Sequence, residues 1–239
     1  MKTYLAAVAL TLATLSSGAS ATITTFAQGN QTFAGYAVSY DSTTKTLSNY
    51  GTNLFTFDIY QDGHSSLEST FSLSATSAAT AVSAGGQKIM DGFTGSFSFT
   101  YNGPDTTLNG ITYHAGDNLL TGIFSNAAIV GNGSAGSFAA TNQDGTVEFS
   151  SAALDFLPTA SRDFSFALNA AFPSFAVIGG NLQSFSASAT GTFASDPAPI
   201  LNSSTPEAST WAMLIMGFGA IGGTVRSSRR RRFGPTATA

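Results

Sequence analysis

The sequence has 239 residues, of which only 9% are charged, and it contains no cysteine. This length suits one ordinary domain with appendages, and the lack of cysteine excludes disulfide bonds, a thiol nucleophile and cysteine-based metal sites. Between residues 22 and 205 twelve acidic residues stand against three basic ones, which argues against the clustered Lys and Arg side chains that nucleic-acid binding requires.

The first 21 residues are predicted to be a secretory signal peptide. Lys2 precedes an apolar run from Tyr4 to Leu15, and Ala19 and Ala21 supply the small residues of a cleavage site. A basic start, an apolar run and an A-x-A exit are the parts of such a peptide, and the run is shorter than the roughly 20 residues that span a membrane. We therefore expect export through the secretion translocon and cleavage by signal peptidase after Ala21.

Residues 22–194 are predicted to form an all-β exported domain. Five segments alternate between apolar and polar residues, as in strands with one buried and one solvated face. They are "YAVSY" (36–40), "LFTFDIY" (54–60), "FTGSFSFTY" (93–101), "FSFAL" (164–168) and "FSASATGTF" (185–193). Asp-Gly or Asn-Gly pairs, which favour tight turns, begin at residues 62, 91, 102, 109 and 144. These features predict an antiparallel sandwich or barrel-like body, and we find no fixed-length repeat of the kind that solenoids show.

Two segments are expected to differ from this strand pattern. One helix is predicted over residues 150–157, because Pro158 would end it there. Residues 195–205 are rich in Pro, Ser and Asn, and this composition predicts an exposed linker after the domain.

Residues suited to catalysis are few. His64 and His114 are the only histidines, and no G-x-S-x-G segment marks a nucleophilic serine. A glycosidase needs only two carboxylates, so a secreted hydrolase acting on polysaccharide stays open as an alternative. Four of the acids, Asp62, Asp91, Asp117 and Asp144, however, lie beside Gly or Asn, where Asp stabilises turns. The sequence therefore predicts no enzyme and no catalytic residue.

Oxygen ligands for calcium are also sparse. Asp58, Asp62 and Asp117 are candidates, but their segments lack the ligand series and terminal Glu of an EF-hand loop. We expect these aspartates to stabilise turns, and we expect no bound metal and no cofactor.

The C-terminal stretch permits two interpretations, of which the first is a dinucleotide site. Gly217, Gly219 and Gly222 match G-x-G-x-x-G. Such a fingerprint needs a strand before it, a helix after it and an acid about 20 residues further on. The chain after Gly222 is short, rich in arginine and without acids, so we attribute the match to the frequency of glycine.

The second interpretation is a membrane-spanning helix. Residues 211–225 carry no charge, and a helix over residues 208–228 would be about 31 Å long, enough to cross a bilayer. Trp211 would lie at the outer interface, and Gly219 and Gly223 would permit close helix contact. The basic residues that follow would stay in the cytoplasm. They are Arg226, Arg229, Arg230, Arg231 and Arg232.

Residues 206–232 resemble a PEP-CTERM sorting domain of Gram-negative bacteria. The resemblance rests on Pro206, Glu207 and Ala208, on the triplet Trp211, Ala212 and Met213, on the triplet Gly217, Phe218 and Gly219, and on the terminal arginines. Ala208 replaces the family's second proline, and residues 233–239 form a short tail beyond the arginines. The resemblance implies cleavage near Glu207 by an exosortase, a membrane protease or transpeptidase. Tails of this type are also named after an ice-binding protein C-terminal domain.

These expectations combine into one functional hypothesis. The protein would be held transiently in the inner membrane and then reach the cell surface or extracellular matrix as a structural or adhesive component, in contact with extracellular polysaccharide. Besides the hydrolase, an ice-binding protein is an alternative. Thr-x-Thr sequences are isolated, however, as at residues 22–24 and 190–192.

Overall fold

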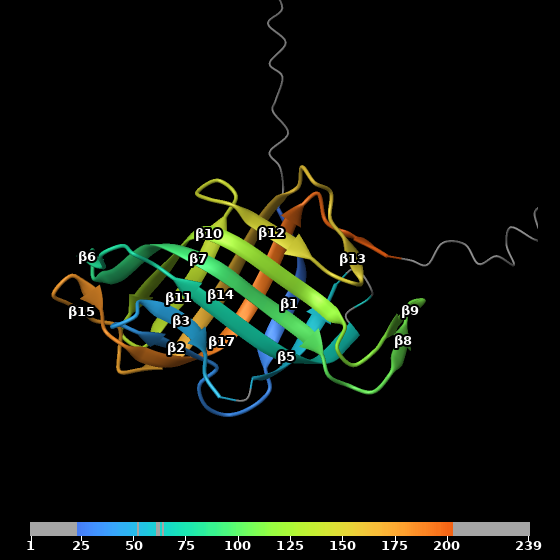
Figure 1. The fold of residues 1–239 in the computed structure, drawn as a ribbon, viewed down its shortest axis with the longest axis horizontal. Coiled ribbons are helices and arrows are strands. Elements are labelled where there is room, and N and C mark those ends of the chain that lie inside the picture. The colour runs from blue at the N-terminus through green and yellow to red at the C-terminus, as the bar shows by residue number, and fades with distance from the viewer. Residues whose placement is uncertain (1–22, 52, 61–62, 64, 203–239) are drawn as a thin grey trace, which may run out of the picture.

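The computed structural model describes residues 23–202, except 52, 61–62 and 64, and this part of the chain is all-β (Figure 1). The strands, in chain order, are β1 (Thr24–Gln31), β2 (Val38–Asp41), β3 (Thr46–Asn49), β4 (Leu54–Ile59), β5 (Ser65–Thr76), β6 (Val82–Ala84), β7 (Gln87–Tyr101), β8 (Thr106–Leu108), β9 (Ile111–Tyr113), β10 (Asn118–Asn132), β11 (Ala135–Thr141), β12 (Val147–Ser150), β13 (Leu154–Asp155), β14 (Ser161–Phe172), β15 (Val177–Ile178), β16 (Asn181–Leu182), β17 (Phe185–Asp196) and β18 (Ile200–Leu201). Within these described residues no helix has the length and apolar character needed to cross a membrane. The predicted signal peptide, sorting motif, transmembrane helix and terminal arginines lie outside them.

The largest sheet closes on itself through antiparallel pairs. From β1 the pairing runs through β4, β5, β7, β10, β11, β14 and β17, and β17 pairs again with β1. The hairpin of β2 and β3 bridges β17 and β5 beyond the ends of β1 and β4. β12 lies beside β10, and β6 lies beside β7. The prediction of an antiparallel all-β body is confirmed.

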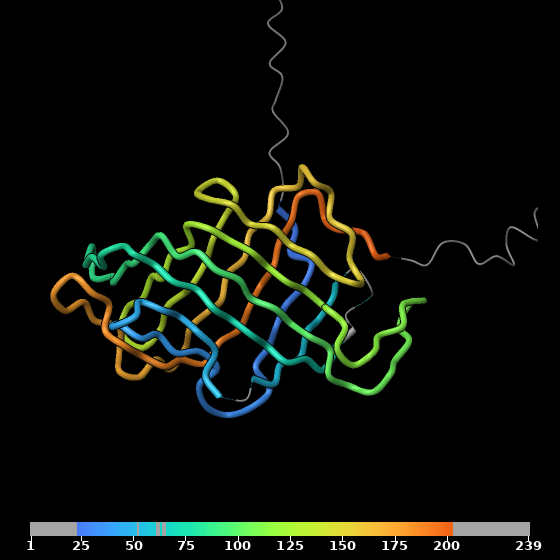
Figure 2. The backbone as a smooth tube through the Cα atoms, viewed as in Figure 1, coloured from blue at the N-terminus to red at the C-terminus, as the bar shows by residue number. Residues whose placement is uncertain are grey.

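The ring is folded into two layers that cross each other. In Figure 1, β5, β7 and β10 run across the front, and β1, β14 and β17 run behind them in a different direction. Figure 2 shows the same crossing in the backbone, with the small hairpin of β8 and β9 extending from one end. Layers packed in this way bring the side chains of both inner faces into one core.

Phenylalanine rings fill the space between the two layers. Phe97 of β7 lies 5.2 Å from Phe164, 5.3 Å from Phe166 and 5.2 Å from Phe193, measured between ring centroids. The first two belong to β14 and the third to β17, so one ring of the front layer contacts both strands behind it. The alternation predicted for "FTGSFSFTY", "FSFAL" and "FSASATGTF" is confirmed, because their aromatic side chains are buried.

Glycines in the strands make room for these rings. Gly29 of β1 pairs with Gly191 of β17, and a Cβ atom on Gly29 would lie 2.6 Å from Cζ of Phe99. A Cβ atom on Gly122 of β10 would likewise overlap the ring of Phe97. Both positions require glycine because a ring rests on the backbone there, from the facing layer at Gly29 and from the neighbouring strand β7 at Gly122.

Of the predicted turns, the structure confirms some and corrects one. Asn109 and Gly110 join β8 to β9 with φ angles of 50° and 82°, and residues 144–145 lie in the turn between β11 and β12. Asp91 and Gly92, however, lie inside β7 rather than between strands. Gly92 has a φ of 69°, and the pairing with β10 shifts register there, so the glycine permits a bulge instead of a hairpin.

The helix predicted over residues 150–157 is wrong. β12 ends at Ser150, and β13 then pairs with β18. Between them the hydroxyl of Ser151 accepts hydrogen bonds from the N–H groups of Ala153 and Leu154, at 3.0 and 3.2 Å. Pairing with a distant strand therefore takes precedence over the local helical preference.

Part of the segment predicted as a linker packs against the body. Ser195 is fully buried in β17, and its hydroxyl donates a hydrogen bond to the carbonyl of Pro197 at 2.9 Å. Asn202 donates its backbone N–H to the carbonyl of Ala153 at 2.8 Å. Residues 195–202 thus belong to the folded unit, and residues 203–205 lie outside the described part of the chain.

Candidate functional site

Asp58, the first candidate calcium ligand, takes part in a hydrogen-bond network. It lies in β4, and its carboxylate accepts hydrogen bonds from Asn30 Nδ2 at 3.0 Å and from Ser66 Oγ at 2.6 Å. These bonds link β1, β4 and β5 on the outer side of the sheet. Among the described residues no group of three or more His, Asp or Glu side chains is placed to hold a metal ion. Asp62 and His64 lie outside that part of the chain.

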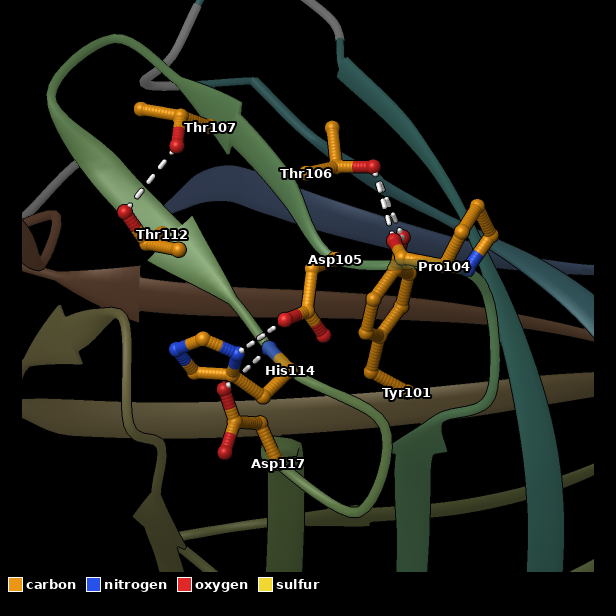
Figure 3. Close-up of polar contacts among 8 residues, drawn as sticks. All are labelled: Tyr101, Pro104, Asp105, Thr106, Thr107, Thr112, His114 and Asp117. Carbon is orange, nitrogen blue, oxygen red and sulfur yellow. Dashed lines mark hydrogen bonds and ion pairs between the residues drawn. The ribbon is translucent and has the colours of Figure 1, made fainter.

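His114 stands between two carboxylates next to the hairpin of β8 and β9 (Figure 3). Its Nδ1 atom lies 3.0 Å from Oδ2 of Asp105, and its backbone N–H donates to Oδ2 of Asp117 at 2.8 Å. The side chains of His114 and Asp105 are 59% and 70% exposed. In a Ser-His-Asp triad a carboxylate orients the histidine, and a serine hydroxyl is hydrogen-bonded to the imidazole. Asp105 matches that carboxylate, but within residues 23–202 as described no serine hydroxyl is hydrogen-bonded to the imidazole of His114.

The other contacts in Figure 3 hold the hairpin together. The hydroxyl of Tyr101 donates to the carbonyl of Pro104 at 2.6 Å. The hydroxyls of Thr107 and Thr112 lie 3.0 Å apart across the two strands. Asp117 has the turn-stabilising role that the sequence predicts, because it binds a backbone N–H three residues before it.

The outer side of the front layer carries a neutral surface of hydroxyl groups, termed here the hydroxyl face. It consists of Thr46, Ser48, Thr70, Ser72, Ser74, Thr76, Thr94, Ser96, Ser98, Thr100 and Thr121. None of these residues is buried. They alternate along each strand with core residues, so the packing of the core determines which way they point.

Strand register arranges these residues in rows that run across the strands. The rows are Thr46, Thr76 and Thr94; Ser48, Ser74 and Ser96; Ser72, Ser98 and Thr121; and Thr70 with Thr100. Neighbouring strands lie about 4.8 Å apart, and successive outward residues of one strand lie about 6.6 Å apart. The hydroxyl face is therefore a regular two-dimensional array.

Most of these hydroxyls form no hydrogen bond with another described residue, although Thr46 donates to the carbonyl of Thr44 and Thr70 accepts from Asn102 Nδ2. Thr121 donates to Asn118 Oδ1 at 2.9 Å, but in the described part of the chain the serines of the two central rows form no side-chain hydrogen bond. A serine hydroxyl can donate one hydrogen bond and accept two. The array therefore offers unused donors and acceptors to a molecule outside.

Charged groups lie at the margin of the hydroxyl face. Asp41 pairs in register with Thr46 at one end of a row. The N–H of Thr43 donates to Oδ1 of Asp41 at 2.8 Å, and this bond lowers the pKa of the carboxyl group. Glu148 lies opposite Ile123 at the far end of the row that contains Ser96. Lys45, next to Thr46, adds a basic group whose Nζ donates to the carbonyl of Ala79 at 2.8 Å. A neutral centre with charges only at its margin suits an uncharged ligand.

The sequence indicated part of this surface. Alternation predicts that Ser96 and Ser98 point away from Phe97, but the rows depend on the register between strands far apart in the chain. A search for Thr-x-Thr along the sequence cannot find rows that run across it.

No protein-family profile, curated protein or solved structure shows a significant match to the chain.

Proposed function

We propose that this protein is exported and then sorted at its C-terminus by an exosortase-like membrane enzyme. The signal-peptide pattern that ends at Ala21 and the stretch from Pro206 to Arg232 support this proposal. The C-terminal helix holds the chain in the inner membrane until cleavage near Glu207 frees the body. The mature protein then resides at the cell surface or in the extracellular matrix of a Gram-negative bacterium.

In that location the body is a non-catalytic adhesive component that binds neutral polysaccharide through the hydroxyl face. The observation that carries this proposal is the array of free, uncharged hydroxyls over β3, β5, β7 and β10. A polysaccharide chain presents hydroxyls in a repeating order, so each serine can donate to one sugar oxygen and accept from another. Polyanionic chains are disfavoured because the described residues that make up the face include no cation.

The same rows favour ice binding as the second candidate function, because ice also presents a regular array of hydrogen-bonding groups. Polysaccharide is preferred because the central rows consist mostly of serine. A serine side chain is less restricted at χ1 than threonine and adapts its hydrogen bonds to an irregular, hydrated chain. We expect no thermal hysteresis in a cooled solution of the protein, and a clear hysteresis gap would favour ice instead.

Co-sedimentation of the full chain, kept in mild detergent, with insoluble cellulose tests the binding proposal. The triple variant Ser72→Ala, Ser96→Ala, Ser98→Ala should bind about tenfold more weakly or worse, because it removes several hydrogen-bonding groups at once. The matched control is Ser137→Ala, Ser165→Ala, Thr192→Ala, which removes three outward hydroxyls from β11, β14 and β17. Equal binding by the two triple variants would contradict the proposal.

Intact-mass spectrometry of the protein from cells and from medium tests the sorting proposal. The expected mature form begins at Thr22 and ends within a few residues of Glu207. A form that retains residues 211–232 and occurs only in the inner membrane would show that no such cleavage takes place.

A further inference from the structure

The loop between β1 and β2 leaves an open hollow against β17. β1 pairs with β17 as far as Thr190, and β2 resumes the pairing at Ala187. In Figure 2 this loop lies at the lower edge of the ring, in blue. Between the two pairings the side chain of Gln31 bonds to the backbone of β17, where its Oε1 atom accepts a hydrogen bond from the N–H of Ala189 at 3.1 Å.

The same side chain fixes the shape of the loop. Nε2 of Gln31 donates to the carbonyl of Phe33 at 2.7 Å and to the carbonyl of Gly35 at 2.9 Å. The amide therefore ties β17 and two points of the loop together through three hydrogen bonds. A wall held in this way is formed before any ligand arrives, so little conformational entropy is lost on binding.

The opposite wall comes from an irregularity in β14. The register between β14 and β17 shifts after the pair Asn169 and Ser188. Next to that shift Ala170 has a φ of 51°, a left-handed conformation that costs free energy for a residue other than glycine. The hydroxyl of Ser188 donates to the carbonyl of Asn169 at 3.0 Å and holds the two strands together at this point. Such strained positions persist where the surrounding structure holds them in place, and they occur often at ligand sites.

The hollow between these walls has a volume of about 620 Å³, and none of the described residues that line it is acidic or basic. Phe33 packs on the core and supports the loop from within. Tyr36 is half-buried, and its ring meets that of Tyr50 edge-on at a centroid distance of 6.2 Å. Thr190 adds a hydroxyl to the lining. The volume falls in the range of small-molecule sites, which combine aromatic walls with a few polar groups.

We propose that this hollow binds a single sugar unit of a neutral saccharide, with the ring of Tyr36 against the apolar face of the sugar and Thr190 bonded to one of its hydroxyls. A sugar ring has apolar C–H faces and a polar rim, which matches an aromatic wall beside a hydroxyl. The inference takes its ligand class from the proposed function, but it concerns a second site. The hydroxyl face would hold the length of a chain, whereas the hollow would hold one unit of it.

Calorimetric titration of the full chain, kept in mild detergent, with the soluble oligosaccharide cellotetraose tests this site. Tyr36→Ala should weaken binding about tenfold, since it removes the aromatic wall. Thr190→Val keeps the shape of the side chain and removes only its hydroxyl, so it should weaken binding about threefold without affecting the fold. The matched control is Thr192→Val, which removes the next outward hydroxyl of β17 and should bind cellotetraose as the unchanged chain does.

The triple serine variant of the hydroxyl face separates this inference from the proposed function. We expect it to bind cellulose more weakly and cellotetraose as the unchanged chain does, whereas the Tyr36 and Thr190 variants should bind cellotetraose more weakly. The inference is overturned if the unchanged chain binds cellulose but not cellotetraose, or if Tyr36→Ala and Thr190→Val leave cellotetraose binding intact. If the unchanged chain binds neither probe, the proposed function is overturned together with the inference.

Discussion

The inner and outer sides of the front layer contrast sharply, although they belong to the same strands. On the inner side of β7 the ring of Phe97 contacts three other rings from the layer behind. On the outer side Ser96 and Ser98 form no side-chain hydrogen bond with any described residue. The inner side thus stabilises the fold, and the outer side is left available. Variants on the two sides should therefore differ in what they change.

Phe97→Ala should show the largest effect. Removal of the ring leaves a cavity between the layers, so we expect the free energy of unfolding to fall by about 3–5 kcal/mol. Denaturant unfolding of the full chain, followed by circular dichroism, measures this change. Ser98→Ala, on the next residue but the opposite side, is the control and should stay within about 0.5 kcal/mol of the unchanged chain. Similar losses for both would remove the contrast between the two sides.

Gly122→Ala tests the inner side by addition rather than removal. A methyl group there would overlap the ring of Phe97, so we expect a loss of about 1–3 kcal/mol in the same unfolding measurement. The double variant Gly122→Ala, Phe97→Leu should lose less than the sum of the two single changes, because the smaller side chain makes room for the methyl group. If the two losses in free energy of unfolding were strictly additive, the residues would not be coupled, and the predicted overlap between them would be wrong.

Asp58→Ala sharpens the contrast between two outer surfaces. Asp58 accepts bonds from Asn30 and Ser66, unlike the free serines of the hydroxyl face. Loss of these bonds should lower the free energy of unfolding by about 1 kcal/mol, and binding to cellulose should not change. Ser72→Ala, which breaks no internal bond, serves as the comparison. A larger loss for Ser72→Ala than for Asp58→Ala would contradict the assignment of the two surfaces.

Asp163→Asn should give the smallest effect, and one that depends on pH. Partial burial, followed by the nearby charge of Asp144, raises the pKa of Asp163 above its usual 3.8. Because the folded state binds this proton more tightly, the carboxyl group stabilises the fold below pH 3.8, and this stabilisation is lost as the pH rises through the raised pKa.

The neutral asparagine avoids that loss. At pH 7 the free energy of unfolding of Asp163→Asn should therefore exceed that of the unchanged chain by less than about 0.5 kcal/mol, and the variant should melt at a slightly higher temperature. Below pH 3.8 this advantage should disappear. Melting curves across this pH range measure the difference. An advantage that grows towards acid pH would show that the pKa is lowered instead.

The all-β fold and its inner residues were predictable from the sequence because alternation with period two is a local signal. It identified the strands around Phe97, Phe166 and Phe193 directly. Other elements depended on partners far along the chain. The segment after Ser150 forms β13 instead of a helix because β18 pairs with it. The bulge at Gly92 in turn depends on the register with β10.

The candidate sites were less predictable for the same reason. Outward serines could be assigned strand by strand, but a row such as Ser48, Ser74 and Ser96 combines three strands. The hollow beside Tyr36 depends on hydrogen bonds of Gln31 and on the backbone of Ala170, and neither leaves a pattern in the sequence. The sorting segment is the opposite case, because its features are consecutive residues.

The closed ring of strands has a consequence for how this protein behaves when many copies are crowded together. Proteins with few charges repel one another weakly, and open strand edges then offer sites for edge-to-edge aggregation. Here β17 pairs with β1, so the longest strands of the described chain have partners on both sides, and open edges are confined to short strands such as β6. The body can therefore accumulate at high density and still meet its neighbours through faces rather than through backbone pairing.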